Sequence, residues 1–270
     1  MEISNTHFNF VAEKNIYFME ERYNRNRIYV RNEEQTMIKN TRILLAGAGI
    51  GSVIAECALR FGFENLIIVD FDKVELSNLN RQNYTESDMG KYKTEALTNR
   101  LLSINSQAKI TCYNCPVDES NVVSLVEDCD IAVNALDYKS NIPFLFDETC
   151  KKYNIPVLHP YNFGWAGFLT IVKPSGIQLS QISEDPKDFE LKVAEYVFKY
   201  SSFWNISREW INRIVEEYKN EDSILPPPQL SIASWIVAGL CVNAMYNITT
   251  GKDIKAFPNF YFSSLHVENR

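Results

Sequence analysis

A short apolar run that leads directly into a glycine-rich turn constrains this chain more than any other feature. Residues 42–46 (RILLA) are followed by Gly47-Ala48-Gly49-Ile50-Gly51-Ser52, and residues 53–61 then recover the apolar spacing of a helix. This order predicts a strand, a tight glycine turn and a helix. Such a unit is typical of open α/β sheets with parallel strands.

The alternation of strand and helix patterns continues along the chain. A second apolar run, residues 65–70, suits a strand that is buried on both faces, and it ends on Asp70. Further helices are expected at 91–103 and 121–127, and further strands at 109–113, 131–136 and 156–158. The pattern predicts an α/β fold, a Rossmann-like doubly wound and mostly parallel sheet.

The alternation of strand and helix patterns ends in the C-terminal third of the chain. Residues 167–172 are expected to form a strand of an antiparallel extension, and residues 260–267 a final strand. The charged and aromatic insert 181–222 is expected to fold over the site or cap the sheet. It contains one amphipathic helix, whose apolar face carries Trp210, Ile211, Ile214, Val215 and Tyr218. We divide the chain into a helical lead-in (1–40), a nucleotide-binding core (41–160) and a C-terminal extension (161–270), packed as one domain with the core.

Composition indicates which kinds of partner the protein can bind and in which cellular compartment it is expected. The net charge is −7, without a long basic run, so a nucleic-acid partner is unlikely. The N-terminus lacks a signal-peptide pattern and the six cysteines are scattered, which favours a cytoplasmic protein. The charge-free stretch 230–250 is nearly long enough to span a bilayer, but Ser231, Ser234, Asn243 and Asn247 interrupt it, and Gln229 precedes it. A helix in the core or at an interface is the favoured interpretation, with no membrane contact.

The glycine turn and the next strand end match a phosphate-binding pattern. Backbone amides of Gly47, Gly49 and Gly51 can face a phosphate at the start of the helix, and Asp70 can accept hydrogen bonds from ribose hydroxyls. From these four residues alone, a dinucleotide, a mononucleotide and no ligand at all remain open.

The next segment distinguishes among these possibilities. Asp70 is followed by Asn78-Leu79-Asn80-Arg81-Gln82 and by Gly90-Lys91-Tyr92-Lys93. Upstream stands Arg22-Tyr23-Asn24-Arg25, and downstream Asn134-Ala135-Leu136-Asp137. In this order and spacing, over about residues 20–175, the sequence resembles the ThiF/MoeB/HesA family of ubiquitin-activating-like adenylating enzymes.

The resemblance implies an ATP-dependent adenylyltransferase that activates the C-terminal carboxylate of a ubiquitin-like protein, a sulfur-carrier protein or a peptide. It implies ATP and Mg²⁺ as cofactors, and it suggests roles for individual residues. Arg81 and Lys93 would stabilise charge on the phosphates, Asp137 would bind the metal ion, and Arg25 would reach the γ-phosphate of a neighbouring subunit. The nucleotide would further contact Gly47, Gly49, Gly51, Asp70, Asn78, Gln82 and Asp72, although a solvated surface charge is the alternative role for Asp72.

Three departures from the family pattern affect this interpretation. The glycine motif is one residue shorter than usual between Gly49 and Gly51, which leaves the register of the turn open. The lone pair Cys112 and Cys115 on a strand is a poor tetrahedral site, so no zinc is predicted. No cysteine stands between Cys150 and Cys241, where relatives that form a thioester carry one, and all six cysteines are expected to be buried.

Other functions and features stay open at this stage. The chain also resembles the cyclic threonylcarbamoyladenosine dehydratases, which act on tRNA, and a non-catalytic nucleotide-binding or NAD-type scaffold is a third possibility. A homodimer is expected, both from the Arg25 motif and because the apolar 230–250 helix needs a partner to cover it. His159 is expected to be a structural histidine, and Phe163 and Trp165 could line a peptide groove or pack in the core.

Overall fold

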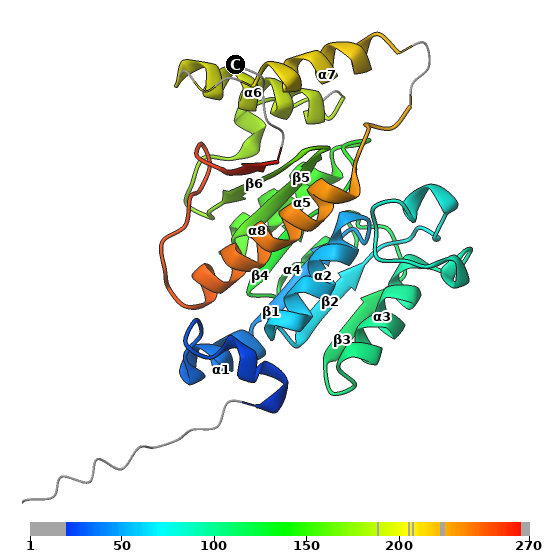
Figure 1. Cartoon of the computed structure of the whole chain (residues 1–270), viewed down its shortest axis with the longest axis vertical. Helices are drawn as coiled ribbons and strands as arrows, with labels where there is room; N and C mark the ends of the chain where they lie inside the picture. The colour runs from blue at the N-terminus through cyan, green and yellow to red at the C-terminus, as the bar shows by residue number, and fades with distance from the viewer. Residues whose placement is uncertain (1–19, 188, 205, 207, 222–224, 266–270) are drawn as a thin grey trace, which may run out of the picture.

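The computed structural model describes residues 20–187, 189–204, 206, 208–221 and 225–265 (Figure 1). Its centre is a seven-stranded sheet in the order β3-β2-β1-β4-β5-β6-β7. The first five strands are parallel and the last two antiparallel, which confirms the predicted sheet with an antiparallel extension. The strands are β1 (Arg42–Ala46), β2 (Asn65–Val69), β3 (Lys109–Tyr113), β4 (Ile131–Asn134), β5 (Val157–Phe163), β6 (Ala166–Val172) and β7 (Tyr261–Ser264).

Helices cover both faces of this sheet. The α-helices are α1 (Asn32–Asn40), α2 (Ile50–Phe61), α3 (Lys93–Ile104), α4 (Val122–Val126), α5 (Ile142–Lys152), α6 (Phe189–Phe203), α7 (Glu209–Lys219) and α8 (Ser231–Thr249). Four 3-10 turns connect them: η1 (Glu21–Asn26), η2 (Leu76–Asn78), η3 (Glu86–Asp88) and η4 (Leu179–Gln181). The whole described C-terminal part therefore packs against the same sheet as the nucleotide-binding pattern.

Successive residues of a strand point to opposite faces of the sheet, so their side chains pack in two separate cores, as a doubly wound sheet requires. On one face, Ile43, Leu45 and Leu158 pack in a core together with residues of α2, α3 and α8. On the other face, Leu44 and Ala46 pack under α4 and α5, and the β5–β6 hairpin packs under α6 and α7. Figure 1 shows α8, α2 and α3 side by side in front of the sheet. The insert 181–222 therefore caps the antiparallel half of the sheet.

The apolar helix α8 is covered on its inner face by its own chain. It is long and apolar enough to cross a membrane by length and composition, yet Val237, Ala238, Cys241 and Met245 are buried against α2 and the β5–β6 hairpin. A β-hairpin and a helix of the same molecule thus remove this face from water. Only 44% of the helix is buried in this way, and Trp235 on the outer face is 54% exposed, so the expectation that a partner subunit covers α8 stays a prediction for that outer face.

Element boundaries differ from the sequence prediction at two places that matter for the site. α2 begins at Ile50, so Gly49 is the residue before its first turn and Gly51 lies inside the helix. β4 ends at Asn134, two residues before the predicted end, although the Ala135 amide still donates a hydrogen bond to Ala46 O of β1 at 2.8 Å. Of the predicted last strand 260–267, residues 261–264 are extended, and 266–267 lie outside the described residues.

The cysteines are less uniformly buried than expected. Cys129, Cys150 and Cys241 are buried, but Cys57 and Cys115 are only partly buried. Cys112 is exposed because β3 is the edge strand of the sheet, with no further strand beyond it in the described part of the chain. The expectation that all six thiols are buried was therefore wrong for these three.

Candidate functional site

The glycine turn joins β1 to α2 and requires glycine at only one of its positions. Gly47 has φ +98°, and a Cβ there would lie 2.3 Å from Ala135 O. A Cβ on Gly51 would meet only Leu45 Cδ2 at 3.8 Å, an ordinary contact. The first amides of α2 have no acceptor within the helix, and its dipole is positive at this end, so the turn is suited to bind an anion.

Asp70 connects the end of β2 to the glycine turn. Its Oδ2 accepts a hydrogen bond from the amide of Ala48 at 2.6 Å, and its Oδ1 accepts one from the amide of Asp72 at 2.7 Å. Burial raises the pKa of Asp70, whereas the nearby Lys93 charge and the two amide bonds oppose this shift. A carboxylate has about four lone-pair sites, so Asp70 keeps acceptor capacity for a ribose hydroxyl.

Lys93 is held at the start of α3 by Asp72. The Lys93 Nζ lies 2.8 Å from Asp72 Oδ2, and the Lys93 amide donates to Asp72 O at 2.9 Å. The lysine side chain is buried, whereas the aspartate side chain is about half exposed. Asp72 is thus placed to orient the lysine, a role that differs from both predicted ones, nucleotide contact and solvated surface charge.

The Arg81 guanidinium is fixed by neutral groups. Its Nε donates to Gln229 Oε1 at 2.7 Å, and its Nη1 donates to Ser77 O at 2.7 Å and to Asn80 Oδ1 at 2.8 Å. Across the described residues no carboxylate lies within 4.0 Å of it. Burial lowers the pKa of Arg81, and the Asp137 charge opposes that shift. The guanidinium therefore has no direct ion pair among the described residues, and the Asp137 charge acts on it only from beyond 4.0 Å.

Asn78 and Gln82 shape the loop between β2 and α3. Asn78 is buried, and its Oδ1 accepts from the Glu75 amide at 3.0 Å, which closes the η2 turn. The Gln82 amide group reaches the glycine turn, where its Nε2 would lie 3.4 Å from a Cβ on Gly49. Tyr84, which the sequence analysis did not single out, donates its hydroxyl to Ala48 O at 2.8 Å. These residues fix the turn rather than add charge to it.

Asp137 follows β4, as predicted, and is exposed to solvent. Its Oδ2 lies 2.7 Å from Nζ of Lys139, a residue that the sequence analysis missed although it stands two positions after the motif. The hydrogen bond to Asp137 is the main reason that the pKa of Lys139 is raised, and the Asp72 charge adds to it. Charged side chains thus gather at the carboxyl ends of β2 and β4, and the charge of each acts on a neighbour in the group. The group consists of Lys93, Asp72, Lys139, Asp137 and Arg81.

Asp137 is the carboxylate at this place that would hold a magnesium ion. Magnesium in nucleotide sites is usually held by one or two carboxylates, substrate phosphates and water. The exposed Asp137 carboxylate fits that role, and among the described residues no cluster of three or more metal-ligating side chains exists. The donor set therefore fits an ion that arrives with the nucleotide rather than one resident in the protein.

Arg25 lies far from this site within its own chain. It belongs to η1, which is attached to the opposite end of the sheet: the Tyr23 hydroxyl donates to Glu64 Oε1 at 2.7 Å, and Asn26 Nδ2 donates to Phe61 O at 3.0 Å. Phe61 is the last residue of α2, and a helix of 12 residues is about 18 Å long. The structure thus brings together every predicted site residue except Arg25.

The insert contacts the site through the first turn of α6. The Phe189 ring stacks on Tyr138, with ring centroids 4.2 Å apart. Burial raises the pKa of the neighbouring Glu190, and the Asp137 charge raises it further. This contact places the start of α6 beside the 137–139 loop, at the edge of the charged group.

Two further sequence candidates are also placed. His159 is buried, with Nε2 3.3 Å from Asp147 Oδ2, but neither ring nitrogen has a hydrogen-bond partner among the described residues, so the histidine expected to be hydrogen-bonded is buried without such a bond. Trp165 is 42% exposed at the β5–β6 turn, whereas Phe163 stacks on Phe168. Of the two aromatic residues, only Trp165 is available to a partner.

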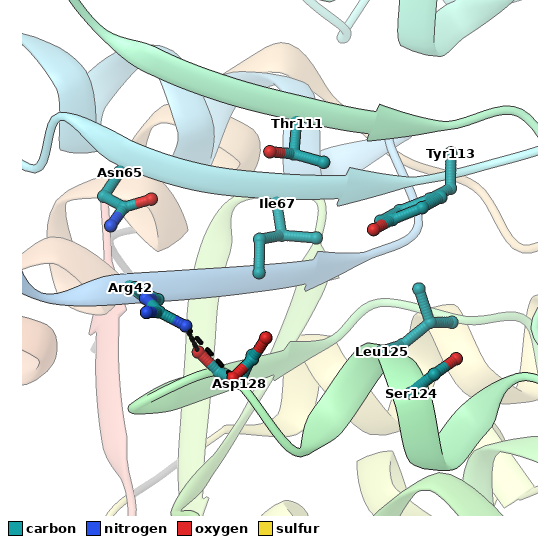
Figure 2. Close-up of a pocket in the computed structure, with 8 residues that line it drawn as sticks. All are labelled: Arg42, Asn65, Ile67, Thr111, Tyr113, Ser124, Leu125 and Asp128. Atoms are coloured by element: carbon teal, nitrogen blue, oxygen red, sulfur yellow. Dashed lines mark hydrogen bonds and ion pairs between the residues drawn. The ribbon is translucent and has the colours of Figure 1, made fainter.

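A hollow of about 190 Å³ on the other side of the sheet is distinct from this site (Figure 2). It is lined by residues of β1, β2, β3 and α4, and Arg42, the cation in its lining, is paired with Asp128 at 3.3 Å. Its lining lacks a glycine turn and an unpaired cation, the features that mark the candidate site at the carboxyl ends of the strands.

A glycine turn at a helix start, an acid at the end of the next strand and two fixed cations define a phosphate-binding α/β protein of the Rossmann-like class. Within that class the chain belongs to the ThiF family, whose model matches residues 23–269. The predicted resemblance is thereby confirmed.

Curated relatives share about a third of the aligned residues. The chain is 29% identical to the sulfur carrier protein ThiS adenylyltransferase of Bacillus subtilis over 69% of this chain and 66% of that protein. It is 31% identical to the SAMP-activating enzyme E1 of Haloferax volcanii over 58% of this chain and 59% of that protein. It is 31% identical to the adenylyltransferase and sulfurtransferase MOCS3 of Caenorhabditis briggsae over 51% of this chain and 34% of that protein. The matched segments thus span about one third to two thirds of these relatives.

Solved structures share the fold over nearly the whole chain. PaaA superposes with a TM-score of 0.67 at 21% identity, covering 97% of this chain and 84% of that one. Escherichia coli MccB in complex with ATP superposes with a TM-score of 0.65 at 19% identity, covering 90% of this chain and 71% of that one. At these identities the likeness supports the fold.

Proposed function

We propose that this protein is an ATP-dependent adenylyltransferase that activates a carboxylate and releases pyrophosphate. The observation that carries the proposal is the placement of Arg81 and Lys93 at one end of the sheet, beside the glycine turn and Asp70. The names of the adenylyltransferases among the relatives agree with it.

The proposed reaction needs positive charge rather than an acid or a base. A carboxylate oxygen of the substrate forms a bond to the α-phosphorus of ATP, and the bond from that phosphorus to the bridging oxygen of the β-phosphate breaks. The products are an acyl adenylate and pyrophosphate, and no proton is transferred. Because all the reacting groups are anionic, fixed cations lower the barrier, and Arg81 and Lys93 supply them.

Magnesium would supply further charge neutralisation when it arrives with the nucleotide, and Asp137 is the carboxylate that would hold it. The other parts of the chain position the nucleotide. The first amides of α2 would contact a phosphate, Asp70 would hold the ribose, and Asp72 would keep Lys93 directed at the site.

We propose the C-terminus of a small protein or peptide as the substrate. Relatives are named for the sulfur carrier protein ThiS and for SAMP, and an MccB structure is described with MccA. The exposed Trp165 offers an aromatic surface at the same end of β5 to which the site belongs. A C-terminal tail presents a carboxylate on a narrow, extended chain, which suits a site at the carboxyl ends of the strands.

We further propose a homodimer in which Arg25 completes the neighbour's site. The position of η1 supports this assembly, because Arg25 is exposed and lies at the end of the sheet opposite the Gly47 turn of its own chain. An arginine with this placement can reach a nucleotide only in another subunit.

The first test is nucleotide binding by calorimetry, with ATP and magnesium in one titration and NAD in another. We expect ATP to bind and NAD to bind more weakly or not at all. Tighter binding of NAD would replace the proposal with an NAD-binding scaffold. The second test is exchange of labelled pyrophosphate into ATP with C-terminal peptides or tRNA added, where exchange that depends on tRNA alone would favour a tRNA-modifying enzyme.

A further inference from the structure

The segment that joins the helical insert to α8 touches the catalytic arginine. We call residues 225–230 the strap; it contains Pro226, Pro227 and Pro228 and leads into the start of α8 (Figure 1). Gln229 in the strap accepts a hydrogen bond from Arg81 Nε at 2.7 Å, and its backbone oxygen accepts one from Asn80 Nδ2 at 3.4 Å. Gln229 thus contacts the loop between β2 and α3 directly, although it lies about 150 positions further along the chain.

The strap is fixed at both sides of this contact. Asn162 Nδ2 donates to Leu230 O at 2.8 Å and to Ser234 Oγ at 3.0 Å, and Asn162 Oδ1 accepts from the Leu230 amide at 3.3 Å. On the other side the three prolines restrict the backbone to extended conformations. Gln229, which is partly buried, is therefore presented to Arg81 from a restrained segment.

The chemistry of the Arg81 contacts is unusual for an arginine that is about half buried. A guanidinium has five N–H donors, and here Nε and Nη1 are directed to an amide oxygen of Gln229, a backbone oxygen of Ser77 and an amide oxygen of Asn80. Each acceptor orients the group without cancelling its charge. Among the described residues Nη2 has no hydrogen-bond partner, so this end of the group is left for a ligand.

We propose that Gln229 is a positioning residue for Arg81, and that its neutrality is what the site requires. Gln229 holds the guanidinium plane in place through Nε and leaves both the charge and the Nη2 hydrogens for a phosphate of the nucleotide. This inference rests on the proposed adenylation function. It makes the strap a second contact between the C-terminal part of the chain and the nucleotide site, beside that of the first turn of α6.

The test compares two changes at the same position. Gln229→Glu keeps the size and the acceptor oxygen but adds a negative charge that pairs with Arg81, and we expect it to weaken ATP binding at least about tenfold. Gln229→Ala removes the acceptor, and we expect it to lower the rate of pyrophosphate exchange more than it weakens ATP binding, because the charge remains but the orientation is lost.

Two controls make the result specific. Gln107→Glu adds the same charge on an exposed loop before β3, at the other end of the sheet, and should leave ATP binding unchanged. Thermal melting of each variant reports whether the fold is kept. A purely structural role of Gln229 predicts that the isosteric Gln229→Glu variant behaves like the wild type.

Binding of ATP·Mg is measured by calorimetry on the full chain, and exchange is measured in parallel. Wild-type-like ATP binding by Gln229→Glu in a folded protein would overturn the inference. Failure of the wild type itself to bind ATP would instead overturn the proposed function. These two failures are therefore distinguished in the same experiment.

Discussion

The Lys93 ammonium lies 2.8 Å from the Asp72 carboxylate, and this ion pair joins the end of β2 to the start of α3. The lysine is buried although its partner is half exposed. A phosphate that binds here would therefore contact a lysine whose position is already fixed. The Lys93 ammonium would interact with both the phosphate and the Asp72 carboxylate. Positioning before the reaction is what makes such a charge effective in stabilising a transition state.

Replacing Lys93 should therefore impair catalysis far more than folding. We expect Lys93→Ala to lower pyrophosphate exchange by roughly two to three orders of magnitude, the scale observed when one transition-state donor is lost. Lys91→Ala is the matched control, because Lys91 lies on the same loop but is exposed and paired with Asp88. A Lys93→Ala enzyme with exchange equal to that of Lys91→Ala would remove Lys93 from the catalytic group.

The glycine turn makes a prediction about stability. Gly47→Ala forces a Cβ to within 2.3 Å of Ala135 O at a positive φ, so we expect the free energy of unfolding in urea to fall by on the order of 1–3 kcal/mol or more. Gly51→Ala, inside α2, meets only an ordinary contact and should be neutral or slightly stabilising. Equal loss of stability in the two variants would contradict this account of the turn.

Much of this arrangement can be predicted from local sequence patterns. The strand predicted at 109–113 has the same bounds as β3, and most helices and strands predicted before residue 160 agree within three residues, because buried parallel strands are continuous apolar runs between helical patterns. The strand predicted at 156–158 extends to Phe163 as β5, and α5 (Ile142–Lys152) was not predicted. The parallel topology brings the predicted charged residues together, because the segments that carry them all follow the carboxyl ends of strands. These residues are Asp70, Arg81, Lys93 and Asp137.

Features that could not be predicted depend on contacts between distant segments. Gln229 bonds to Arg81 from about 150 positions further along the chain, and nothing around residue 229 marks it as a site residue. The packing of α8 depends on such contacts as well: a charge-free helix shows that it must be covered, but not that α2 and the β5–β6 hairpin cover its inner face. Asp72 was ambiguous because its role depends on the position of Lys93.

The proposed homodimer can be tested by complementation. We expect Arg25→Ala and Asp137→Ala to be inactive separately in pyrophosphate exchange and to regain part of the activity when the subunits are mixed and allowed to re-form dimers. Partial rescue arises because some heterodimer sites carry both wild-type residues. Arg27→Ala, a change at an exposed arginine in the same segment, serves as the control and should be active alone. Absence of rescue in a verified heterodimer would place Arg25 outside the neighbour's site.

The contact between α1 and α8 predicts a pH dependence of stability. Glu34 accepts a hydrogen bond from the Arg31 amide and contacts Lys252 Nζ at 2.9 Å and the Tyr246 hydroxyl at 3.0 Å. The Arg31 amide bond, and next the Lys252 contact, lower the pKa of Glu34 from 4.5 to about 2.

A carboxyl whose pKa is lower in the folded state stabilises the fold above its unfolded pKa and loses that effect as the pH falls toward the folded pKa. We therefore expect the free energy of unfolding to drop between about pH 5 and pH 2 in the wild type, with a shallower slope in Glu34→Gln. Glu33→Gln, at a neighbouring position in the first turn of α1, should match the wild-type profile. Parallel slopes for wild type and Glu34→Gln would show that other carboxylates carry the acid sensitivity.

The arrangement of the thiols bears on the fate of the acyl adenylate. Burial raises the pKa of Cys129 to about 12 and raises the pKa of Cys150 and Cys241, so these thiols stay protonated and enclosed. Cys112 is exposed, but it lies on β3, which is separated from the strand of the glycine turn by β2. Two strand spacings amount to about 10 Å, and the pairing of Cys112 with Ile68 holds its backbone in the sheet.

We therefore expect catalysis to stop at the acyl adenylate, or to pass it to a non-thiol acceptor, without a covalent cysteine intermediate. The measurement uses intact-protein mass spectrometry after incubation with ATP, magnesium and the acyl substrate once it has been identified, with and without dithiothreitol. The wild type, a Cys112→Ser variant and a variant with all six cysteines replaced by serine should all form product and show no adduct that dithiothreitol removes. A removable adduct in the wild type that disappears in Cys112→Ser together with product formation would identify a thioester step at the sheet edge and overturn this prediction.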